Sequence, residues 1–169
     1  MFATVSATLP AGARPQGSIE IAHRDDAGST TIALWADEAS APAGERVYRL
    51  IDVLDGPAAG RAPLFGQIVW VNGAGDPAVA DAAERGGRER INPAVQDVEG
   101  LVGVLAFRSA DHRILVVGTT TALETHTEVA HRIAGTPLLP GEDPALLPGP
   151  DGAVLGRVVR ADVPQAVRS

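Results

Sequence analysis

The sequence has no cysteine, no lysine and few aromatic residues, which make up 4% of its 169 residues. Without cysteine it can form no disulfide, no thiolate nucleophile and no thiolate metal site. It also lacks any uninterrupted run of 18 apolar residues, and its N-terminus MFATVSATLP has neither the basic nor the apolar region of a signal peptide. These absences predict a cytoplasmic protein that does not enter a membrane.

Positive charge is the next scarce feature, because 14 basic residues stand against 21 acidic ones and leave a net charge of -7. The charges are spread along the chain, and the arginines form no stripe. A nucleic acid or an anionic membrane would be bound by such a stripe. The sequence therefore predicts neither as a partner.

What the sequence does contain is a repeated strand pattern. Residues 24–41, RDDAGSTTIALWADEASA, match residues 108–125, RSADHRILVVGTTTALET, in pattern. In both, an arginine ends an apolar strand, a short polar turn follows, and a strand with β-branched residues leads to a helix start. This pattern is typical of a β-hairpin. The sequence thus predicts the same hairpin twice.

Further strands flank each predicted hairpin. The strands before the hairpins are predicted at residues 2–8 and 65–71. The strands after them are predicted at residues 46–54 and 154–160. Each copy of the pattern therefore supplies four strands.

The two copies differ in the element between the first strand and the hairpin. In the second copy, Asp76 can cap a helix that begins at Pro77 and runs to Val98, with a kink near Asn92–Pro93. In the first copy, only residues 10–16 occupy this place, and they are too few and too rich in proline and glycine for a helix. The first copy is therefore predicted to lack its first helix.

A second helix is predicted after each hairpin. In the second copy it begins at a capping box, residues 121–124, and ends before Gly135. Its counterpart in the first copy, residues 37–44, is short and contains a proline. Residues 136–152 are rich in proline and glycine, which predicts a structured surface loop or a lid.

The complete copy has the order strand, helix, strand, strand, helix, strand, which is the ferredoxin-like motif. We predict an α+β fold of two such modules, a reduced one at residues 1–60 and a complete one at residues 61–169. The missing helix leaves one sheet face of the first module bare. We expect this face to be covered by a second copy of the chain in a homodimer or by the loop at residues 136–152.

The tandem layout resembles the dimeric α/β-barrel superfamily, in which two ferredoxin-like modules pack sheet to sheet around a cavity. ERINPAVQDVEGLVGV and ILVVGTTTALETHTEVAHRI carry the resemblance, together with IALWADEASA in the first copy. The superfamily includes antibiotic-biosynthesis monooxygenases, haem-degrading monooxygenases and stress-responsive barrel proteins. The chain is most similar to uncharacterised actinobacterial members. The resemblance implies a cavity for a small hydrophobic or aromatic ligand, and oxygen chemistry without flavin or a dedicated metal.

The candidate cavity residues are Trp70, Asn72 and Trp35. In GQIVWVNG, alternation along a strand places Trp70 and Asn72 on one face, and Trp35 is the equivalent ring of the first copy. The resemblance implies that Asn72 and His131 lie near the strand asparagine and the helix histidine of the haem-degrading group, whose strand tryptophan falls at Thr119. Structural alternatives stay open: the tryptophans as packing residues, Asn72 as a turn residue and His131 as a helix C-cap.

Two other kinds of site are rejected from the residues. His126 and His131 lie about 140° apart around a helix, so they cannot bind one metal together. The stretch GAGDPA at residues 73–78 fits a dinucleotide fingerprint, but Asp76 would place a negative charge where the pyrophosphate binds. We predict no metal and no cofactor.

Three functions remain open. The first is a cofactor-independent monooxygenase-like enzyme that acts on a small aromatic or polyketide-like molecule, with no catalytic residue assigned. The second is non-catalytic binding of a small molecule in the same cavity, which the scarcity of titratable residues on the strands favours. The third is a structural or interaction protein that docks a partner on its bare sheet face.

Overall fold

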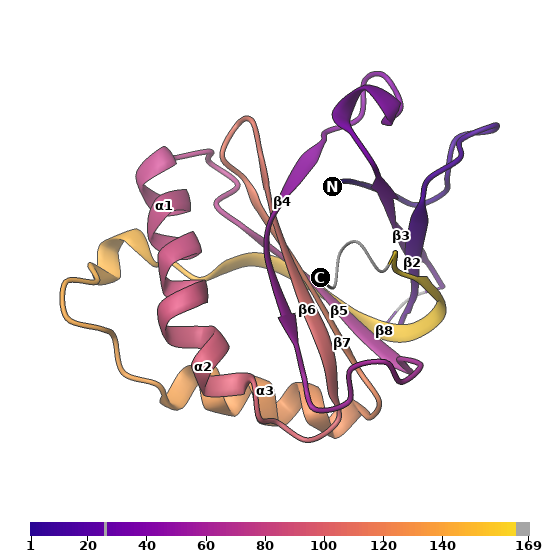
Figure 1. Ribbon diagram of the computed structural model, residues 1–169. Coiled ribbons are helices and arrows are strands. Elements are labelled where there is room, and N and C mark those ends of the chain that lie inside the picture. The colour runs from indigo at the N-terminus through magenta and orange to yellow at the C-terminus, as the bar shows by residue number, and fades with distance from the viewer. Residues whose placement is uncertain (26, 165–169) are drawn as a thin grey trace.

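The computed structural model describes residues 1–25 and 27–164, and in it eight strands close into one antiparallel barrel (Figure 1). The strands are β1 (Phe2–Ser6), β2 (Gly17–His23), β3 (Ser29–Trp35), β4 (Tyr48–Asp55), β5 (Phe65–Val71), β6 (Leu101–Ser109), β7 (Ile114–Thr120) and β8 (Pro150–Asp162). Around the barrel they follow the order β1-β3-β2-β8-β5-β7-β6-β4, and β4 pairs with β1 to close it. Closure gives every strand a neighbour on each side.

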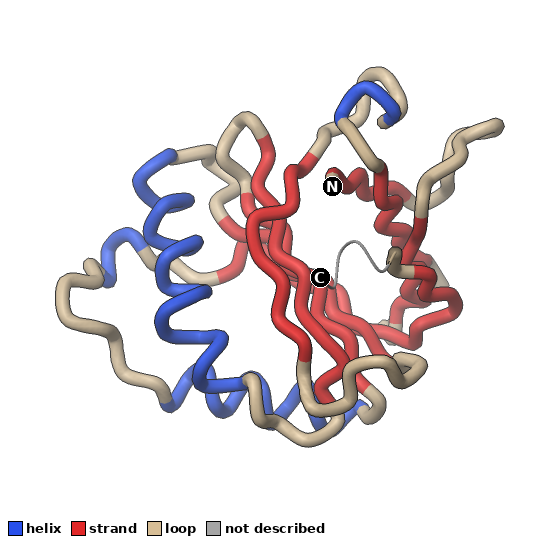
Figure 2. The backbone as a smooth tube through the Cα atoms, in the orientation of Figure 1, coloured by secondary structure: helices blue, strands red, loops and turns tan. Residues whose placement is uncertain are grey.

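The longer helices all lie outside the barrel on one side, next to the wall that contains β4, β5, β6 and β7 (Figure 2). The helical elements are η1 (Glu38–Ser40), α1 (Pro77–Gly86), the π-helical turn η2 (Gly87–Ile91), α2 (Asn92–Val95), α3 (Leu123–Gly135) and η3 (Pro144–Leu146). A small cluster around Val95, Val98 and Leu101 joins α2 and α3 to the wall. None of the described helices has the length and apolar character needed to cross a membrane.

The α+β class and the eight strands predicted from the sequence are confirmed. The barrel order also contains the same neighbour pattern twice, β4-β1-β3-β2 in one half and β8-β5-β7-β6 in the other. The seams between the halves are the pairs β2–β8 and β4–β6. The division into modules at residues 1–60 and 61–169 stays a prediction.

The helix predicted from Asp76 to Val98 exists in three pieces. Asp76 caps it as expected, since its Oδ1 accepts a hydrogen bond from the Ala78 amide at 2.8 Å. The interruption, however, is the π-helical turn that begins at Gly87, one turn before the predicted kink. Glycine is a weak helix former, and Pro93 falls at the start of α2, where a missing amide costs little.

The capping box predicted for α3 is wrong. The residue at the N-cap is Ala122, which has no side-chain hydrogen bond to give. The Thr121 hydroxyl donates to the Gly100 carbonyl at 3.4 Å instead, so it joins the helix start to the beginning of β6.

The loop predicted at residues 136–152 ends earlier, because β8 begins at Pro150. The loop contacts α1 and not the first half of the barrel (Figure 1). Glu142, whose side chain is only 4% exposed, pairs with Arg90 of η2 at 2.9 Å and accepts a hydrogen bond from the Leu139 amide at 2.7 Å. Gly86 makes room for it, since a Cβ there would lie 2.8 Å from Glu142 Oε1. The prediction that this loop covers the helix-free sheet face is therefore wrong.

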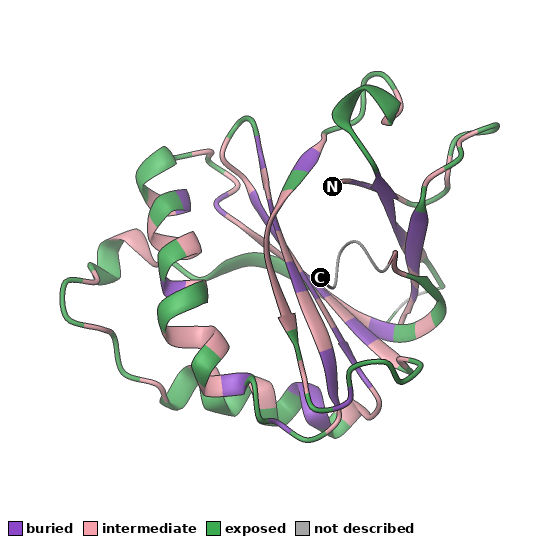
Figure 3. Cartoon of the chain, in the orientation of Figure 1, coloured by how far each residue is buried: buried purple, intermediate pink, exposed green. Residues whose placement is uncertain are grey.

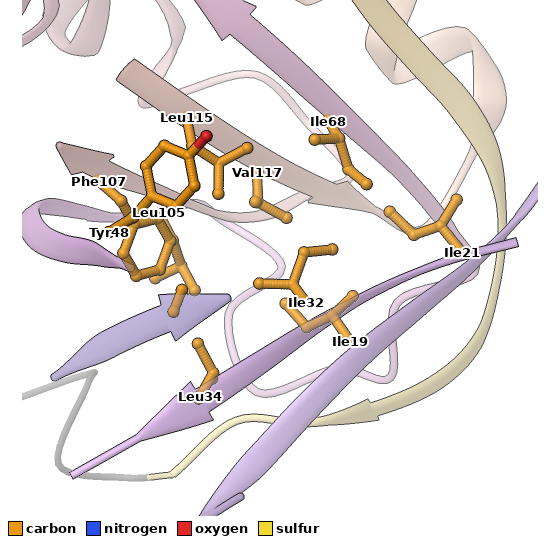
Figure 4. Packing of buried hydrophobic residues seen from close by; sticks show 11 residues of the cluster. Ile19, Ile21, Ile32, Leu34, Tyr48, Ile68, Leu105, Phe107, Leu115 and Val117 are labelled. Carbon is orange, nitrogen blue, oxygen red and sulfur yellow. The ribbon is translucent and has the colours of Figure 1, made fainter. Parts of the chain in front are cut away.

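The barrel interior is filled with apolar side chains (Figure 4). Ile19, Ile21, Ile32 and Leu34 come from the first half of the barrel and meet side chains of the second half such as Phe107. All five are no more than 1% exposed. This packing is the main core of the protein.

The outward face of β1, β3 and β2, where no helix of the described chain lies, is not an exposed apolar surface (Figure 3). Thr4, Ser18, Thr31, Ala33 and Trp35 point outward there, opposite to Ile32 and Leu34, and all five are buried. The large hydrophobic residues that the structure exposes lie elsewhere, at Leu64, Leu138 and Val159. Association into a homodimer through this face stays a prediction.

Candidate functional site

Trp70 lies on the inward face of β5. It follows Ile68 by two residues, pairs in register with Leu115 of β7 and Gly152 of β8, and packs against the main core. The alternation read from the sequence therefore gives its direction correctly. The interior that it faces is filled with side chains, so its contacts are those of a core residue.

Asn72 follows β5 in the left-handed backbone region, with φ of +63°, and is 4% exposed. Its Nδ2 donates to the carbonyls of Asp76 at 2.7 Å and His112 at 2.8 Å. Its Oδ1 accepts a hydrogen bond from the Asp76 amide at 3.1 Å. Both amide hydrogens are therefore engaged in joining the end of β5 to the start of α1 and to the β6–β7 turn.

Trp35 and His131 do not join Trp70. Trp35 points away from the barrel interior, and its Nε1 donates to Thr4 Oγ1 at 3.1 Å on the outer face of β1 and β3. His131 is exposed on α3. Near the end of this helix, where a histidine cap was one alternative, the Thr136 hydroxyl donates to the Arg132 carbonyl at 2.6 Å. The structure thus brings together only Trp70 and Asn72 of the predicted residues.

Asn72 belongs to an end of the barrel that side-chain hydrogen bonds hold together. There Asp151 accepts from the Gly73 amide at 2.7 Å, and the Ser109 hydroxyl donates to Asp111 at 2.6 Å. This bond is the main reason why the pKa of Asp111 lies below its ordinary value, and Arg46 and Arg113 add to the shift. We call the set Asn72, Ser109, Asp111 and Asp151 the hydrogen-bonded end.

The opposite end of the barrel contains a pocket of about 310 Å³. Its walls are loop residues 60–63, the last part of β8 with Val163, and the side chains of Ile19, Val102 and Thr119. Thr119 pairs with Gly66 near the start of β5, whereas Asn72 follows the end of that strand. We call this region the pocket end. Within residues 1–25 and 27–164, no three acidic or histidine side chains converge there or elsewhere to bind a metal.

A smaller cavity of about 30 Å³ adjoins the pocket. It shares four lining residues with the pocket, and Leu105 and Val117 of the main core line it as well. Thr119 is the polar group at the junction, and its hydroxyl donates to the Gly103 carbonyl at 3.3 Å. The oxygen of this hydroxyl still has room to accept a hydrogen bond. An apolar group in the pocket could therefore contact the edge of the core.

Two charged side chains line the pocket, Arg61 and Asp162. Neither has an ion-pair or side-chain hydrogen-bond partner among the residues that the structure describes. The loop that carries Arg61 is fixed by backbone hydrogen bonds, from Gly56 to Val102 at 3.2 Å and from Ala58 to Leu101 at 2.9 Å. The sequence offered no motif for these residues, which are far apart in the chain and meet only when the barrel closes.

His126 is a further residue that the sequence analysis did not select. It lies on α3, is 7% exposed, and its Nε2 is buried without a hydrogen-bond partner. Burial lowers the pKa of His126 to about 4, and a hydrogen bond with the Phe65 backbone offsets part of this shift. A signal was present, because His126 precedes Val129 and Ile133 at helical spacing and so shares their buried face.

No protein-family model and no curated protein sequence matches the chain. Solved structures do resemble it. A major regulator of staphylococcal pathogenesis has a TM-score of 0.62 at 8% identity, over 94% of this chain and 98% of that one. A ferredoxin-fold protein of Listeria monocytogenes related to antibiotic-biosynthesis monooxygenases has a TM-score of 0.51 at 7% identity, over 94% of each chain.

A third similar structure is a protein of Fusobacterium nucleatum proposed to be a monooxygenase. It has a TM-score of 0.52 at 9% identity, over 86% of this chain and 76% of that one. At such low identities the likeness establishes the fold alone. The chain therefore has the ferredoxin-type barrel fold of proteins related to antibiotic-biosynthesis monooxygenases. Its similarity to actinobacterial members stays a prediction.

Proposed function

We propose that the protein binds a small molecule at the pocket end of the barrel and does so without catalysis. The observation that carries this proposal is the pocket of about 310 Å³, whose lining residues Ile19, Val102 and Val163 also line the smaller cavity beside the core. Clefts that combine apolar side chains with a few polar groups are typical of small-molecule sites. No pair of titratable side chains within the described pocket is placed to pass a proton.

The barrel interior itself supports this location. Its side chains form the main core, the cavity that adjoins them measures only about 30 Å³, and Trp70 is part of that packing. A ligand is therefore expected at the mouth of the barrel rather than between Trp70 and Trp35. This places the proposed site at the end opposite to Asn72.

The test is a thermal-shift and native mass spectrometry screen with a library of small metabolites. Ala62 is exposed on the pocket loop, so Ala62→Trp should block the pocket without disturbing the core. Ala39→Trp places the same ring on the exposed η1 and serves as the control. We expect ligands that stabilise the wild type and Ala39→Trp but not Ala62→Trp. Equal binding to all three proteins would contradict a site in this pocket.

A second function, cofactor-independent oxidation of an electron-rich aromatic molecule, is favoured by the surface between the helices and the wall. Gln67, Val104 and Gly118 point outward there and are half-buried, and a Cβ at Gly118 would meet nothing within 4 Å. His126 meets β5 at Phe65, on the same face as Gln67, and is neutral at pH 7. The His126 Nε2 has no hydrogen-bond partner and could accept a hydrogen bond from a phenolic substrate that reached it.

In this second function the substrate supplies the electrons. A methylene group beside the aromatic ring would become a carbonyl group, one atom of O₂ would enter it, and the other would leave as water. The relation of two similar structures to monooxygenases supports the proposal at the level of the fold. Oxygen uptake with a panel of hydroxylated aromatic compounds tests it. His126→Gln should abolish the uptake and His131→Gln should not, and uptake that survives in His126→Gln would remove His126 from the mechanism.

A further inference from the structure

The barrel is closed unevenly, and the seam between β1 and β4 is its shortest contact. These two strands share only two residue pairs, whereas every other pair of neighbouring strands shares at least five. A bond from the Leu50 amide to the Met1 carbonyl at 3.0 Å ends the contact. β4 continues through residues 51–55, where β6 is its only strand partner among the described residues. Beyond Ile51, whose carbonyl accepts a hydrogen bond from Arg88 at 3.0 Å, one side of β4 is therefore an unpaired edge.

The alternation of the strand tells which backbone groups lie on this edge. The Gly56 amide donates to the Val102 carbonyl of β6 at 3.2 Å, so Gly56 faces β6. In an antiparallel ladder, alternate residues turn their amide and carbonyl groups to opposite sides. Leu54 therefore faces β6 as well, and Val53 and Asp55 face the seam. We call the amides and carbonyls of Val53 and Asp55 the free edge of β4.

The other half of the barrel shows what can lie beside such a strand end. There the Val158 amide of β8 donates to the Leu64 carbonyl at 3.0 Å, which is the counterpart of the bond from Leu50 to Met1. Beyond this bond, residues 60–63 precede β5 and line the larger pocket together with the end of β8. In the first half, no described residue forms a hydrogen bond with the free edge. The equivalent place beside β4 is therefore open to an added strand.

The side chains next to the free edge define what an added strand would carry. Val53 points into the barrel and packs against the main core, yet it is only half-buried. The cavity of about 30 Å³ lies beside it and is also lined by Leu105 and Asp55. Asp55 follows Val53 by two residues, so it lies on the same face, and it is exposed. An apolar side chain would fit opposite Val53, and a basic one opposite Asp55.

We propose that the free edge of β4 binds an extended segment of another protein by strand addition. The segment runs antiparallel to β4 and in line with β1. It carries a basic residue opposite Asp55 and, two residues later, an apolar residue opposite Val53. The backbone hydrogen bonds supply affinity, and the carboxylate and the cavity supply specificity. A second copy of the chain would bring two acidic edges together, so the charges favour a different protein. This interaction is separate from small-molecule binding in the larger pocket.

The probe is the peptide TRTVT with an acetylated N-terminus and an amidated C-terminus, which places arginine opposite Asp55 and valine opposite Val53. Nuclear magnetic resonance on the full, isotope-labelled chain measures binding and amide exchange. We expect the peptide to slow exchange at the Val53 and Asp55 amides. The Leu54 amide faces β6 and should exchange slowly with or without the peptide. Replacing the arginine by glutamate should weaken binding roughly two- to fivefold or more, the range for an exposed ion pair.

Two N-methylated peptides test strand addition directly. The amide of the valine points toward β4, so its methylation should weaken binding roughly tenfold or more through loss of a hydrogen bond and a clash. The amide of the central threonine points away, so its methylation should leave binding nearly unchanged. This difference depends on the backbone register and not on the composition of the peptide.

Two variants of Asp55 provide the matching test on the protein. Asp55→Pro removes an amide of the free edge and leaves the ladder with β6 intact, a position at which strands accept proline. It should abolish binding. Asp55→Asn keeps the amide and removes the charge, so it should weaken binding of TRTVT only roughly two- to fivefold. Circular dichroism verifies that both variants fold, and the methylated peptides test the wild type independently of them.

Several results would overturn the proposal. Slow exchange at the Val53 and Asp55 amides without peptide would show that the edge is already paired. If that protection grew with protein concentration, the partner would be a second copy of the chain. Equal binding of the two methylated peptides would exclude strand addition. Absence of binding by TRTVT at millimolar concentration would remove the basic and apolar segment as the occupant.

Discussion

The two ends of the barrel use polar side chains in opposite ways. At the hydrogen-bonded end, Asn72, Ser109, Asp111 and Asp151 all have partners within the protein, most of them backbone groups. At the pocket end, Arg61 and Asp162 have none among the described residues, and His126 on the nearby start of α3 has an unpartnered Nε2. A polar group whose hydrogen bonds are all satisfied stabilises the fold, whereas a fixed group without a partner is available to a ligand.

This comparison also shows why residue type alone misleads. An asparagine near a tryptophan at a strand end can belong to a ligand site. It can equally belong to a tight connection between a strand and a helix. The partners of the asparagine amide decide between the two, and they are visible only in the folded chain. The comparison predicts that substitutions at the hydrogen-bonded end change stability, and that substitutions at the pocket end change ligand binding.

The largest effect is expected for Asn72→Ala. The substitution removes three hydrogen bonds of a buried side chain and places alanine at φ of +63°. A lost hydrogen bond costs about 1 kcal/mol and a left-handed residue about 1 kcal/mol more, so unfolding should become easier by roughly 3 to 4 kcal/mol. Urea denaturation measures the change.

Asn72→Gly is the matched control, because glycine adopts the left-handed conformation without strain. It should lose the hydrogen bonds but avoid the backbone strain. Its free energy of unfolding should therefore be about 1 kcal/mol higher than that of the alanine variant. Ligands found for the pocket should bind both variants as they bind the wild type. If Asn72→Ala kept full stability and lost ligand binding, the ligand site would lie at the hydrogen-bonded end and not at the pocket end.

The next effect is the pH dependence that His126 gives to stability. Its pKa is about 4 in the folded protein and about 6.5 in the unfolded chain. The unfolded state therefore binds a proton below pH 6.5 that the folded state does not, and stability falls between pH 6.5 and pH 4. The shift corresponds to roughly 3 kcal/mol. Above pH 7 the histidine is neutral in both the folded and the unfolded state, so it gives the free energy of unfolding no pH dependence.

Chemical denaturation at pH 7.5, 5.5 and 4.5 measures this dependence. His126→Gln should show a shallower fall in stability across this range, because glutamine does not titrate. His131→Gln, which changes an exposed histidine of the same helix, should retain the wild-type dependence. Identical pH profiles for the two variants would show that the fall in stability belongs to carboxylates elsewhere.

A smaller effect is expected for Asp151→Ala at the hydrogen-bonded end. The Asp151 carboxylate accepts from the Gly73 amide at 2.7 Å and joins the start of β8 to the turn after β5. This bond is exposed, so its loss should reduce stability by about 1 kcal/mol. Asp151→Asn keeps an acceptor oxygen and should recover much of that loss. Hydrogen exchange at the Gly73 amide reports the bond directly, and an unchanged rate in Asp151→Ala would refute it.

Much of the fold was predictable from the sequence because strand alternation and turn residues are local signals. The strand at Phe65–Val71 was predicted with its observed bounds, and the helix cap at Asp76 needed only its neighbours. The inward direction of Trp70 followed from the same alternation. The sequence analysis placed the interruption of this helix near Asn92–Pro93, because a proline inside a helix usually causes a kink, whereas the π-helical turn begins at Gly87. Pro93 lies at the start of α2, where a proline fits.

The candidate site was not predictable in the same way. Arg61 lies in a loop and Asp162 at the end of the last strand, and barrel closure alone brings them to one pocket. The filled interior was also hidden from the sequence, since apolar strand residues can line a cavity as well as fill it. His126 was the exception, because the spacing to Val129 and Ile133 marked its buried face, whereas His131 lay off that face.

The smallest change in stability is expected for Arg61→Gln and Asp162→Asn. Both residues are exposed and have no ion-pair partner among the described residues, so each substitution should alter the free energy of unfolding by less than about 0.5 kcal/mol. Urea denaturation without ligand tests this, and calorimetry with ligands found in the metabolite screen tests the effect on binding. If the two variants lost as much stability as Asn72→Ala, the charges of the pocket would serve to stabilise the fold. Unchanged stability with weakened binding of ligands from the metabolite screen is the result that separates the two ends by function.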